Sequence, residues 1–501
     1  MNLKVMLEEA AKQYGEKTAI ILGENRLSYT ELDKASNRIA NALTKMGVSK
    51  GDRVAILLVN SPEFAIIYFG IVKIGAIAVL LDPKYKVYEL AFLFNDSKPK
   101  VLVAESPYLK PLIPVLSRFK SIKHVIDMSS EYEGHFLSYQ ELMGMGSEQK
   151  VAIEPEPDDL AHIAYTSGPT FQPSGVMLTH QCLIAEAVIS GDGFQQTDKD
   201  MEIMFALPMH HAIGMVIILL TSLIKGSTIV MLPGLSMNSL METIEKERVT
   251  IFMAVPFVYS LMTKMAEEEG IKHDLSSLRL CGSAGSPLSI ETMVQFKHLF
   301  GISIVEYWGL TEAIAHVTCQ PLDGSGKPGS VGHALPGWKV RIVNDNEKEL
   351  PTNQTGEIIV NGPLMKGYYN NQKATTKVMQ DGWLYTGDIG KLDKDGELFI
   401  LGRKKKMIIA KGQNIYPSDI EHVLNIHPKI AEAAVIGISG ELREEKAKAL
   451  ISLKEGEEAT EQEIKQFCLE HLAKYKVPKQ ILFVNSLPKP ATGNIYKEAF
   501  K

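Results

Sequence analysis

Short apolar runs alternate with amphipathic segments through the first 400 residues of the chain. The runs are mostly apolar and are often bounded by Gly, Pro or Asp, which is typical of buried strands. They occupy residues 53–58, 76–81, 101–104, 124–126, 203–207 and 228–232. Between them, apolar residues recur at three- and four-residue spacing in segments such as 28–46 and 237–247, which predicts helices. This alternation predicts stacked α/β layers.

The pattern changes near residue 340. Strands predicted at 339–343 and 357–360, with an Asn-Asp-Asn turn after the first, indicate a small β subdomain. A hairpin is predicted next, with strands at 390–393 and 397–401 joined through a Lys-Asp-Gly turn.

The last hundred residues or so have a βαβ-like pattern of their own. Their predicted strand, strand, helix and strand occupy residues 433–437, 448–453, 461–471 and 480–484. We therefore predict an α/β fold with a large N-terminal domain at residues 1–402, made of α/β layers plus the small β subdomain. A short basic linker at 403–406 leads to a small α+β C-terminal domain at 407–501.

Length and composition narrow the class of protein. A chain of 501 residues is too long for one compact core, which predicts two to four domains or subdomains. The net charge of -6 argues against a nucleic-acid partner. Four scattered cysteines without a CxxC pair predict reduced thiols in a cytoplasmic protein. The N-terminus lacks signal-peptide features. The apolar runs at 65–81 and 212–224 are interrupted or too short, so no transmembrane helix is predicted. Peripheral contact with a membrane and assembly into a homodimer stay open.

Residues 165–180 carry much of the chemical information and read YTSGPTFQPSGVMLTH. Backbone N–H groups at glycine turns and Ser/Thr hydroxyls can converge on phosphate oxygens. The residues that fit this role are Thr166, Ser167, Gly168, Thr170, Ser174 and Gly175. A surface loop rich in Ser, Thr, Gly and Pro is the alternative for the segment taken alone. The segment resembles the phosphate-binding loop of the adenylate-forming enzymes, whose usual form is YTSGTTGxPKGV.

Three positions of this loop depart from the family pattern. Pro169 stands where the family has Thr and provides no N–H. Phe171 stands where the family has Gly and would be strained at positive φ. Ser174 stands where the family has Lys, and a hydroxyl cannot neutralise phosphate charge.

A second motif, YWGLTE at residues 307–312, resembles the family's YGxTE segment. The resemblance implies that Trp308 stacks on the purine and that Thr311 donates to a phosphate. It also implies that Glu312 holds Mg²⁺, since a carboxylate can hold a cation that bridges phosphate oxygens. An aromatic strand end followed by a helix start is the plainer explanation.

Two more motifs occur in family order. GSAGSPLS resembles the turn where the family's backbone approaches adenine, which implies contacts at Gly285 and Ser286. WLYTGD followed by GRKK resembles the ribose-binding pair, which implies that Asp388 accepts the ribose hydroxyls and that Arg403 completes the ribose and phosphate contacts.

The segment PMHHAIG at residues 208–214 resembles the family's PxFHxxG. His211 takes the position that lines the acyl site and gates pantetheine entry, and His210 takes the aromatic position. Amino-acid-activating relatives carry an Asp near this point, and this segment has none, which weighs against an amino-acid substrate.

Two motifs near the C-terminus complete the resemblance. AKGQNIYP resembles the loop that swings over the acyl site for thioester formation, which implies a role for Lys411, and Lys405 takes the hinge position. The C-terminal domain is therefore expected to be mobile about the hinge. LPKPATGNI resembles the family's LPxTxxGK ending, with Asn494 at the position of the Lys that bridges acyl carboxylate and phosphates.

The resemblance covers essentially the whole chain and implies an AMP-forming acyl-CoA synthetase that uses ATP, Mg²⁺ and CoA. A carboxylic acid, expected to be an aliphatic (fatty) one, attacks the α-phosphorus of ATP, and the CoA thiol then attacks the acyl-adenylate. Both absent lysines, at Ser174 and Asn494, serve the first step. Loss of one preorganised transition-state donor typically costs about 2.7–4 kcal/mol, so adenylation is expected to be impaired.

Two alternatives stay open. The chain can be a catalytically degenerate homologue that binds nucleotide, acyl-AMP or acyl-CoA in a regulatory or scaffolding role. Alternatively, Ser174 and Asn494 are engineered changes, although Pro169 and Phe171 also depart from the pattern.

Overall fold

The computed structural model describes most of the chain. The described residues are 1–129, 131–132, 136–166, 173–232, 234, 236–404, 407–410, 413–439, 445–484 and 487. By their internal contacts they group into two compact units. The first unit holds Met1–Pro83, Asp96–Ala164 and Gly175–Gly402, and the second holds Lys84–Asn95, Tyr165–Ser174 and Arg403–Lys501.

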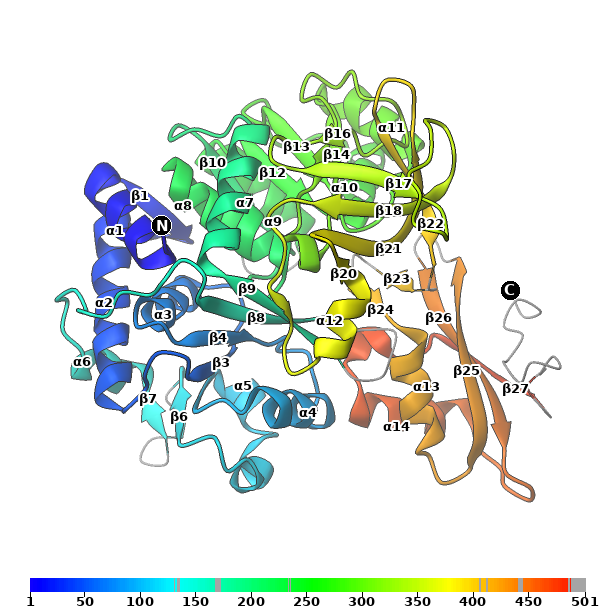
Figure 1. The fold of residues 1–501 in the computed structure, drawn as a ribbon, viewed down its shortest axis with the longest axis horizontal. Coiled ribbons are helices and arrows are strands. Elements are labelled where there is room, and N and C mark those ends of the chain that lie inside the picture. The colour runs from blue at the N-terminus through cyan, green and yellow to red at the C-terminus, as the bar shows by residue number, and fades with distance from the viewer. Residues whose placement is uncertain are drawn as a thin grey trace. The chain divides into compact units, whose positions relative to one another are not determined.

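A nine-stranded sheet is found among the described residues of the first unit, in the order β16-β15-β14-β13-β12-β10-β11-β1-β2 (Figure 1). Its strands are β1 (Thr18–Leu22), β2 (Asn25–Ser28), β10 (Met201–Met204), β11 (Thr228–Met231), β12 (Ile251–Ala254), β13 (Leu280–Ser283), β14 (Ile304–Trp308), β15 (Thr318–Cys319) and β16 (His333–Ala334). The run from β14 to β1 is parallel, so the carboxyl ends of these strands lie along one edge of the sheet.

A second large sheet has eight described strands in the order β19-β9-β8-β4-β3-β5-β6-β7. They are β3 (Arg53–Leu57), β4 (Ile77–Leu80), β5 (Val101–Ala104), β6 (His124–Asp127), β7 (Leu137–Ser138), β8 (Leu160–Thr166), β9 (Ser174–Thr179) and β19 (Gly367–Tyr368). The connecting helices are α1 (Leu3–Tyr14), α2 (Tyr29–Lys45), α3 (Pro62–Lys73), α4 (Val87–Ser97), α5 (Ser106–Leu109), η1 (Ile113–Arg118), α6 (Tyr139–Met145), α7 (His180–Gly193), η2 (Ile213–Leu220), α8 (Thr221–Lys225), α9 (Met237–Glu247), α10 (Pro256–Glu269), α11 (Ile290–Phe300), η3 (Thr311–Ala313) and α12 (Gln372–Val378).

Helix α3 lies between the two large sheets. It contacts β1 of the nine-stranded sheet, β3 and β4 of the eight-stranded sheet, and helices α1 and α2. Every residue from Phe64 to Lys73 is buried, as expected for a helix that is apolar on all sides. Lys73 is the charged exception, and its Nζ donates to Asp33 Oδ1 at 2.5 Å and to Asn37 Oδ1 at 2.7 Å on α2. Burial lowers the pKa of Lys73, while the charge of Asp33 opposes that effect.

Most predicted elements of the N-terminal part are confirmed. The helix predicted at 237–247 and the strand predicted at 101–104 match α9 and β5 residue for residue. The strand predicted at 203–207 is wrong beyond Met204, where β10 ends. The physical reason is that Ala206 has a φ of 58°, which an extended strand does not allow.

The small β subdomain predicted after residue 339 is confirmed as a five-stranded sheet within the described residues. It contains β17 (Lys339–Val343), β18 (Gly356–Asn361), β20 (Met379–Gln380), β21 (Trp383–Leu392) and β22 (Leu398–Arg403). The predicted hairpin is the pairing of β21 with β22, and its turn is closed by the Gly396 N–H donating to the Asp393 carbonyl at 3.1 Å.

The second unit has its own core, built around the C-terminal strands and helices. Its described elements after residue 403 are β23 (Ile408–Ala410), β24 (Gln413–Ile415), α13 (Pro417–Asn425), β25 (Ile430–Ser439), β26 (Glu445–Leu453), α14 (Glu461–His471), η5 (Lys474–Lys476) and β27 (Gln480–Phe483). β26 and β27 are parallel with α14 between them, so the predicted βαβ pattern is confirmed. Lys476 is buried and pairs with Glu89 at 2.8 Å and Asp419 at 3.2 Å, which ties the segment 84–95 to this unit.

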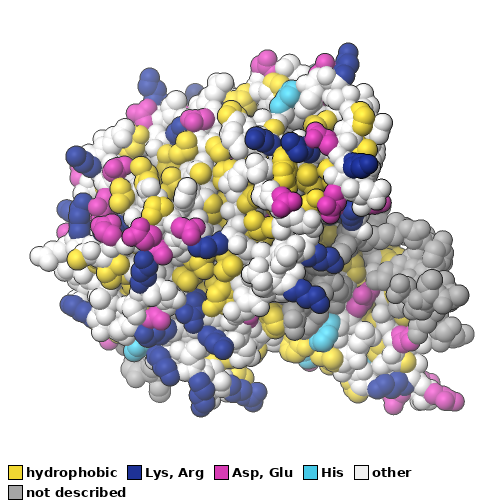
Figure 2. Space-filling view, in the orientation of Figure 1, with side chains coloured by type: hydrophobic (Ala, Val, Ile, Leu, Met, Phe, Trp, Pro, Cys, Tyr) yellow, Lys and Arg dark blue, Asp and Glu magenta, His cyan; other side chains and the backbone are white. Residues whose placement is uncertain are grey.

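The α/β fold class, with a large N-terminal and a small C-terminal domain, is thus confirmed. Across the described residues, no helix combines the length and apolar character needed to cross a membrane. On the face drawn in Figure 2, side chains of both charge signs occur over the surface, consistent with the modest net charge of -6.

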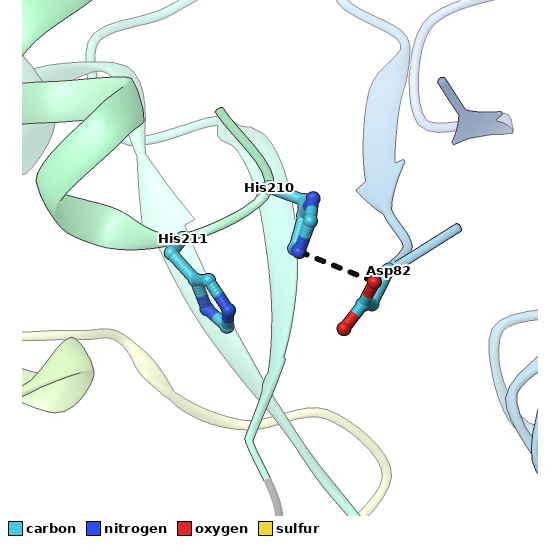
Figure 3. A group of neighbouring side chains, drawn as sticks. All are labelled: Asp82, His210 and His211. Carbon is cyan, nitrogen blue, oxygen red and sulfur yellow. Dashed lines mark ion pairs between the residues drawn. The ribbon is translucent and has the colours of Figure 1, made fainter. Parts of the chain in front are cut away.

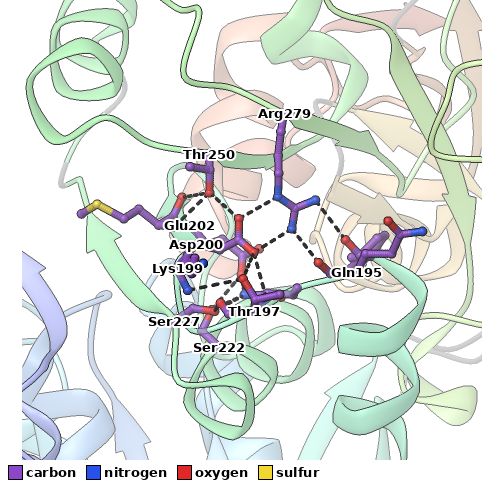
Figure 4. A network of polar contacts seen from close by, with 12 residues as sticks. Gln195, Thr197, Lys199, Asp200, Glu202, Ser222, Ser227, Thr250 and Arg279 are labelled. Carbon is purple, nitrogen blue, oxygen red and sulfur yellow. Dashed lines mark hydrogen bonds and ion pairs between the residues drawn. The ribbon is translucent and has the colours of Figure 1, made fainter. Parts of the chain in front are cut away.

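A buried polar network supports the start of β10 (Figure 4). Arg279 donates to both carboxylate oxygens of Asp200, from Nε at 2.7 Å and from Nη2 at 2.8 Å. Glu202 is fully buried, and its Oε2 accepts from Gln196 Nε2 at 3.1 Å and from Ser222 Oγ at 2.8 Å. Burial raises the pKa of Glu202, and the two hydrogen bonds lower it by less, so the resulting pKa is about 8. Burial therefore favours the protonated form of Glu202 in the folded protein.

This assignment predicts how stability depends on pH. The folded state keeps the proton on Glu202 up to about pH 8, whereas the unfolded chain releases it near the ordinary value of 4.5. Stability from this group is therefore lost as the pH rises through that window, by up to about 1.4 kcal/mol per pH unit. We expect Glu202→Gln, which cannot titrate, to show a smaller fall in Tm than wild type between about pH 5 and pH 8. The exposed Glu24→Gln variant should keep the wild-type slope, and equal slopes for all three proteins would contradict the assignment.

Candidate functional site

Trp308 and Asp388 lie against each other although 80 residues separate them in the sequence. Trp308 ends β14, and Asp388 lies in the middle of β21. The Trp308 Nε1–H donates to Asp388 Oδ2 at 3.2 Å, and both residues are buried. The structure therefore brings together the predicted purine-stacking ring and the predicted ribose carboxylate.

The chain reverses tightly after β14, and this turn carries Thr311 and Glu312. Ile314 and Ala315 have φ values of 55° and 85°, and positive φ is strained for a β-branched residue. A Cβ on Gly309 would lie 2.2 Å from the Ala315 carbonyl oxygen, so the close return of the chain requires glycine there. Strained turns of this kind gather at functional sites.

Tyr368 links Glu312 to the strand that follows the predicted phosphate loop. Its Oη donates to Glu312 Oε1 at 2.8 Å, and its backbone pairs with Val176 on β9. The next residue, Tyr369, donates its N–H to the Gly175 carbonyl at 2.7 Å. Sequence reasoning missed Tyr368, because nothing in its local segment signals a contact with residue 312.

Gly285 and Ser286 lie just beyond β13, which ends at Ser283. Because β13 and β14 are parallel neighbours, these residues leave the sheet at the same edge as Trp308. Gly285 has a φ of 88°, a conformation that favours glycine. The predicted adenine turn thus lies at the edge that carries the predicted stacking ring.

The two ends of the predicted phosphate loop come together. Thr166, at the end of β8, donates its hydroxyl to the Ser174 carbonyl at the start of β9, at 3.4 Å. Arg403 ends β22; its side chain is exposed, and its Nη1 lies 3.3 Å from Met407 Sδ. Several predicted residues lie outside the described residues: Ser167, Gly168, Thr170, Lys405, Lys411 and Asn494, with the departures Pro169 and Phe171.

His211 is exposed and lies just before η2, a π-helix of 8 buried or nearly buried residues. π-Helices are rare and frequent at functional sites. The neighbouring His210 lies beside Asp82, which follows β4; the Nε2 to Oδ1 distance is 3.7 Å (Figure 3). A carboxylate therefore does lie beside the histidine segment, supplied from residues far away in the sequence. Its signal was an acid directly after a buried strand, where sheets place functional side chains.

Family models match both parts of the chain. The model described as "AMP-binding enzyme" matches residues 7–369, and the model described as "AMP-binding enzyme C-terminal domain" matches residues 419–494. The chain belongs to the AMP-binding enzyme family, that is, to the adenylate-forming superfamily and its acyl-CoA synthetase type.

Relatives and solved structures span the full length. A long-chain-fatty-acid–CoA ligase of Bacillus subtilis is 32% identical, over 99% of this chain and 93% of the relative. An indoleacetate–CoA ligase of Aromatoleum aromaticum is 33% identical, over 99% and 97%. The structure of a Mycobacterium tuberculosis fatty acyl CoA synthetase is 30% identical, with a TM-score of 0.75 over 99% and 97% of the two chains.

The contact between Trp308 and Asp388 gives a test of the predicted nucleotide site. Trp308→Phe keeps an aromatic face but removes the N–H that holds the carboxylate in place. We expect AMP affinity, measured by calorimetry, to fall about tenfold, which is roughly 1.4 kcal/mol. The control is Trp338→Phe, which removes a matched donor to Glu186 at 2.8 Å outside the predicted nucleotide contacts. Wild-type affinity in Trp308→Phe would count against a nucleotide site here.

Proposed function

We propose that this chain is an AMP-forming acyl-CoA synthetase that converts an aliphatic, fatty-type carboxylic acid to its CoA thioester through acyl-AMP, with a slow first step. The observation that carries this proposal is the hydrogen bond from Trp308 to Asp388. It places an aromatic ring beside a buried carboxylate, and these groups suit a purine and a ribose. Family membership supports ligation of an acid to a thiol.

On the nucleotide side, the Trp308 ring stacks on the adenine, and the backbone at Gly285 and Ser286 approaches its edge. Asp388 accepts the ribose hydroxyls while Trp308 fixes its orientation. The family resemblance assigns to Arg403 the remaining contacts to ribose and phosphate.

On the phosphate side, Thr311 and Glu312 lie on the strained turn after β14. The Glu312 carboxylate is half-buried, and Tyr368 engages one of its two oxygens. This arrangement fits Mg²⁺, which is commonly held by one or two carboxylates together with substrate phosphates. When bound, the ion would neutralise charge that develops on the phosphate oxygens. The family resemblance assigns the phosphate contacts to Thr166, Ser167, Gly168, Thr170, Ser174 and Gly175.

On the acyl side, His211 lines the entry for the acid and the pantetheine thiol, as its exposure allows. We propose an aliphatic acid on the similarity to long-chain-fatty-acid–CoA ligases of Bacillus subtilis and Mycobacterium tuberculosis, at 32% and 31% identity. The indoleacetate–CoA ligase, at 33% identity, makes an aryl acid the alternative. We propose that the C-terminal domain, residues 407–501, turns about a hinge at 403–406 that includes Lys405. This turn brings Lys411 to the thioester-forming site.

The first step is slow because its positive charges are missing. Ser174 and Asn494 stand where the family places lysines that oppose the charge of the phosphates. The backbone carbonyl of Ser174 accepts a hydrogen bond from the Thr166 hydroxyl. The absence of both lysines also favours the second candidate, a degenerate homologue that binds nucleotide or acyl-CoA without making acyl-AMP.

Restoring both lysines separates the two candidates. We expect Ser174→Lys with Asn494→Lys to raise ATP–pyrophosphate exchange by roughly 10²-fold or more, since each lost donor costs about that much. Thioester formation from synthetic acyl-AMP and CoA should change little. The control variant, Ser147→Lys with Asn25→Lys, makes the same charge change at exposed positions and should leave both rates unchanged.

The assays use aliphatic and aryl acids with and without CoA. Wild-type exchange as fast as thioester formation from supplied acyl-AMP would refute the slow first step. If neither wild type nor the lysine variant forms thioester from any acid or acyl-AMP, the enzyme proposal is wrong and the binding role is favoured. Calorimetry with AMP and acyl-CoA then tests that role directly.

A further inference from the structure

Asp82, His210 and His211 form a group of metal-ligand side chains that the reaction above does not use together (Figure 3). One carboxylate oxygen and one nitrogen from each imidazole all lie within 4.8 Å of one another. We propose that these three residues bind one transition-metal ion of the Zn²⁺ class, with an exchangeable coordination position on the side of His211.

The spacing of the ligand atoms fits a shared ion. Zn–N and Zn–O bonds of about 2.1 Å place two ligand atoms of a tetrahedral site roughly 3.4 Å apart. The Asp82 Oδ1 to His210 Nε2 distance is 3.7 Å, close to that separation and longer than a direct hydrogen bond. By contrast, the surface pair of His273 and Glu245 is in direct contact at 2.8 Å.

Two of the ligands are fixed by the fold and the third can adjust. Asp82 lies two residues after the end of β4, and the Asp82 and His210 side chains are only 3% and 8% exposed. The ring of His211 lies 4.6 Å from that of His210, centroid to centroid, and His211 is exposed. Rotation of the exposed imidazole can therefore close the site around an ion, with little change in the buried pair.

The donor set selects the ion and its fourth ligand. Imidazole suits Zn²⁺, Co²⁺ and Ni²⁺ better than Mg²⁺ or Ca²⁺, which prefer oxygen. One carboxylate and two neutral imidazoles leave a bound divalent ion with a net charge of +1, so the open position favours an anionic ligand. Three protein ligands plus one exchangeable position is the arrangement of catalytic rather than structural zinc sites. A thiolate or a carboxylate has the right charge and donor atom for that position.

A bound ion would take His211 away from its proposed role at the acyl entry. The consequence is inhibition by low concentrations of Zn²⁺, a property that differs from the Mg²⁺ dependence of the nucleotide chemistry. The metal site rests on the three side chains and not on the proposed reaction, so its test needs no ATP, acid or CoA.

The test is direct metal binding by the full chain after removal of metals with a chelator. Zn²⁺ alone is titrated in competition with a chromophoric chelator, and Co²⁺ alone is followed by its visible absorption. We expect one ion per chain, and a change in the Co²⁺ spectrum when a small thiol is added. The four cysteines are all buried, so they do not offer a competing surface site.

Three single variants locate the ion: Asp82→Asn, His210→Gln and His211→Gln. Each removes one ligand and should weaken Zn²⁺ binding by roughly 100-fold. Mutating a residue that only orients a metal ligand already lowers metal affinity by about 10- to 100-fold. His211→Gln keeps the test decisive if the buried variants fail to fold, because His211 is exposed. The control His273→Gln removes a histidine that contacts a carboxylate elsewhere and should leave affinity unchanged. Absence of stoichiometric binding in wild type, or wild-type affinity in His211→Gln, would overturn the proposal.

Discussion

Burial of α3 on all sides is the constraint on which the first unit depends. A helix between two sheets must be apolar around its whole circumference, and both sheets take their positions from it. Lys73 breaks this rule and is accommodated because α2 supplies Asp33 and Asn37 at hydrogen-bonding distance. Removing one partner of such a buried pair typically costs about 3–5 kcal/mol, so the pair also fixes how α2 packs on α3. Strands β3 and β4, and through them Asp82, are placed by this packing.

The proposed nucleotide site depends on a different constraint, the tight turn after β14. Gly309 lets the chain return against Ala315, and the positive φ angles at Ile314 and Ala315 keep the turn narrow. Thr311 and Glu312 are thereby held at the edge where Trp308 ends its strand. Tyr368 then connects this turn to β9. The Tyr368 phenol thus joins the strained turn to the other sheet, and the Met365 N–H adds a hydrogen bond to the Glu312 carbonyl at 2.9 Å.

Much of the fold could be predicted from the sequence because the spacing of apolar residues clearly distinguishes strands from helices. The strand at 101–104 and the helix at 237–247 are bounded by strong local signals, and both match. The end of β10 could not be predicted, since a positive φ at an alanine has no sequence signature. The π-helix η2 was equally hidden, because an unbroken apolar run does not distinguish a π-helix from an α-helix.

The candidate site likewise contains residues that the sequence could predict and residues that it could not. Trp308 and Asp388 could be found from local motifs, but their direct hydrogen bond depends on how β14 and β21 pack. Tyr368 could not be found, because it acts through a partner more than fifty residues away. Asp82 carried a local signal as an acid after a buried strand, but its histidine partner could not be predicted. Local sequence motifs identify the residues that belong to them. Contacts between residues far apart in the sequence depend on how the elements pack, which the motifs do not show.

The tryptophans carry one more consequence of this packing. Indole emission shifts with the polarity of its surroundings, and the three tryptophans of the chain have different polar neighbours. Trp308 and Trp338 each donate to a buried carboxylate, whereas Trp383 lies 4.4 Å from the guanidinium of Arg341. The protein therefore contains its own optical probe: a negatively charged molecule that settles beside Asp388 changes the field at one indole and leaves two internal references.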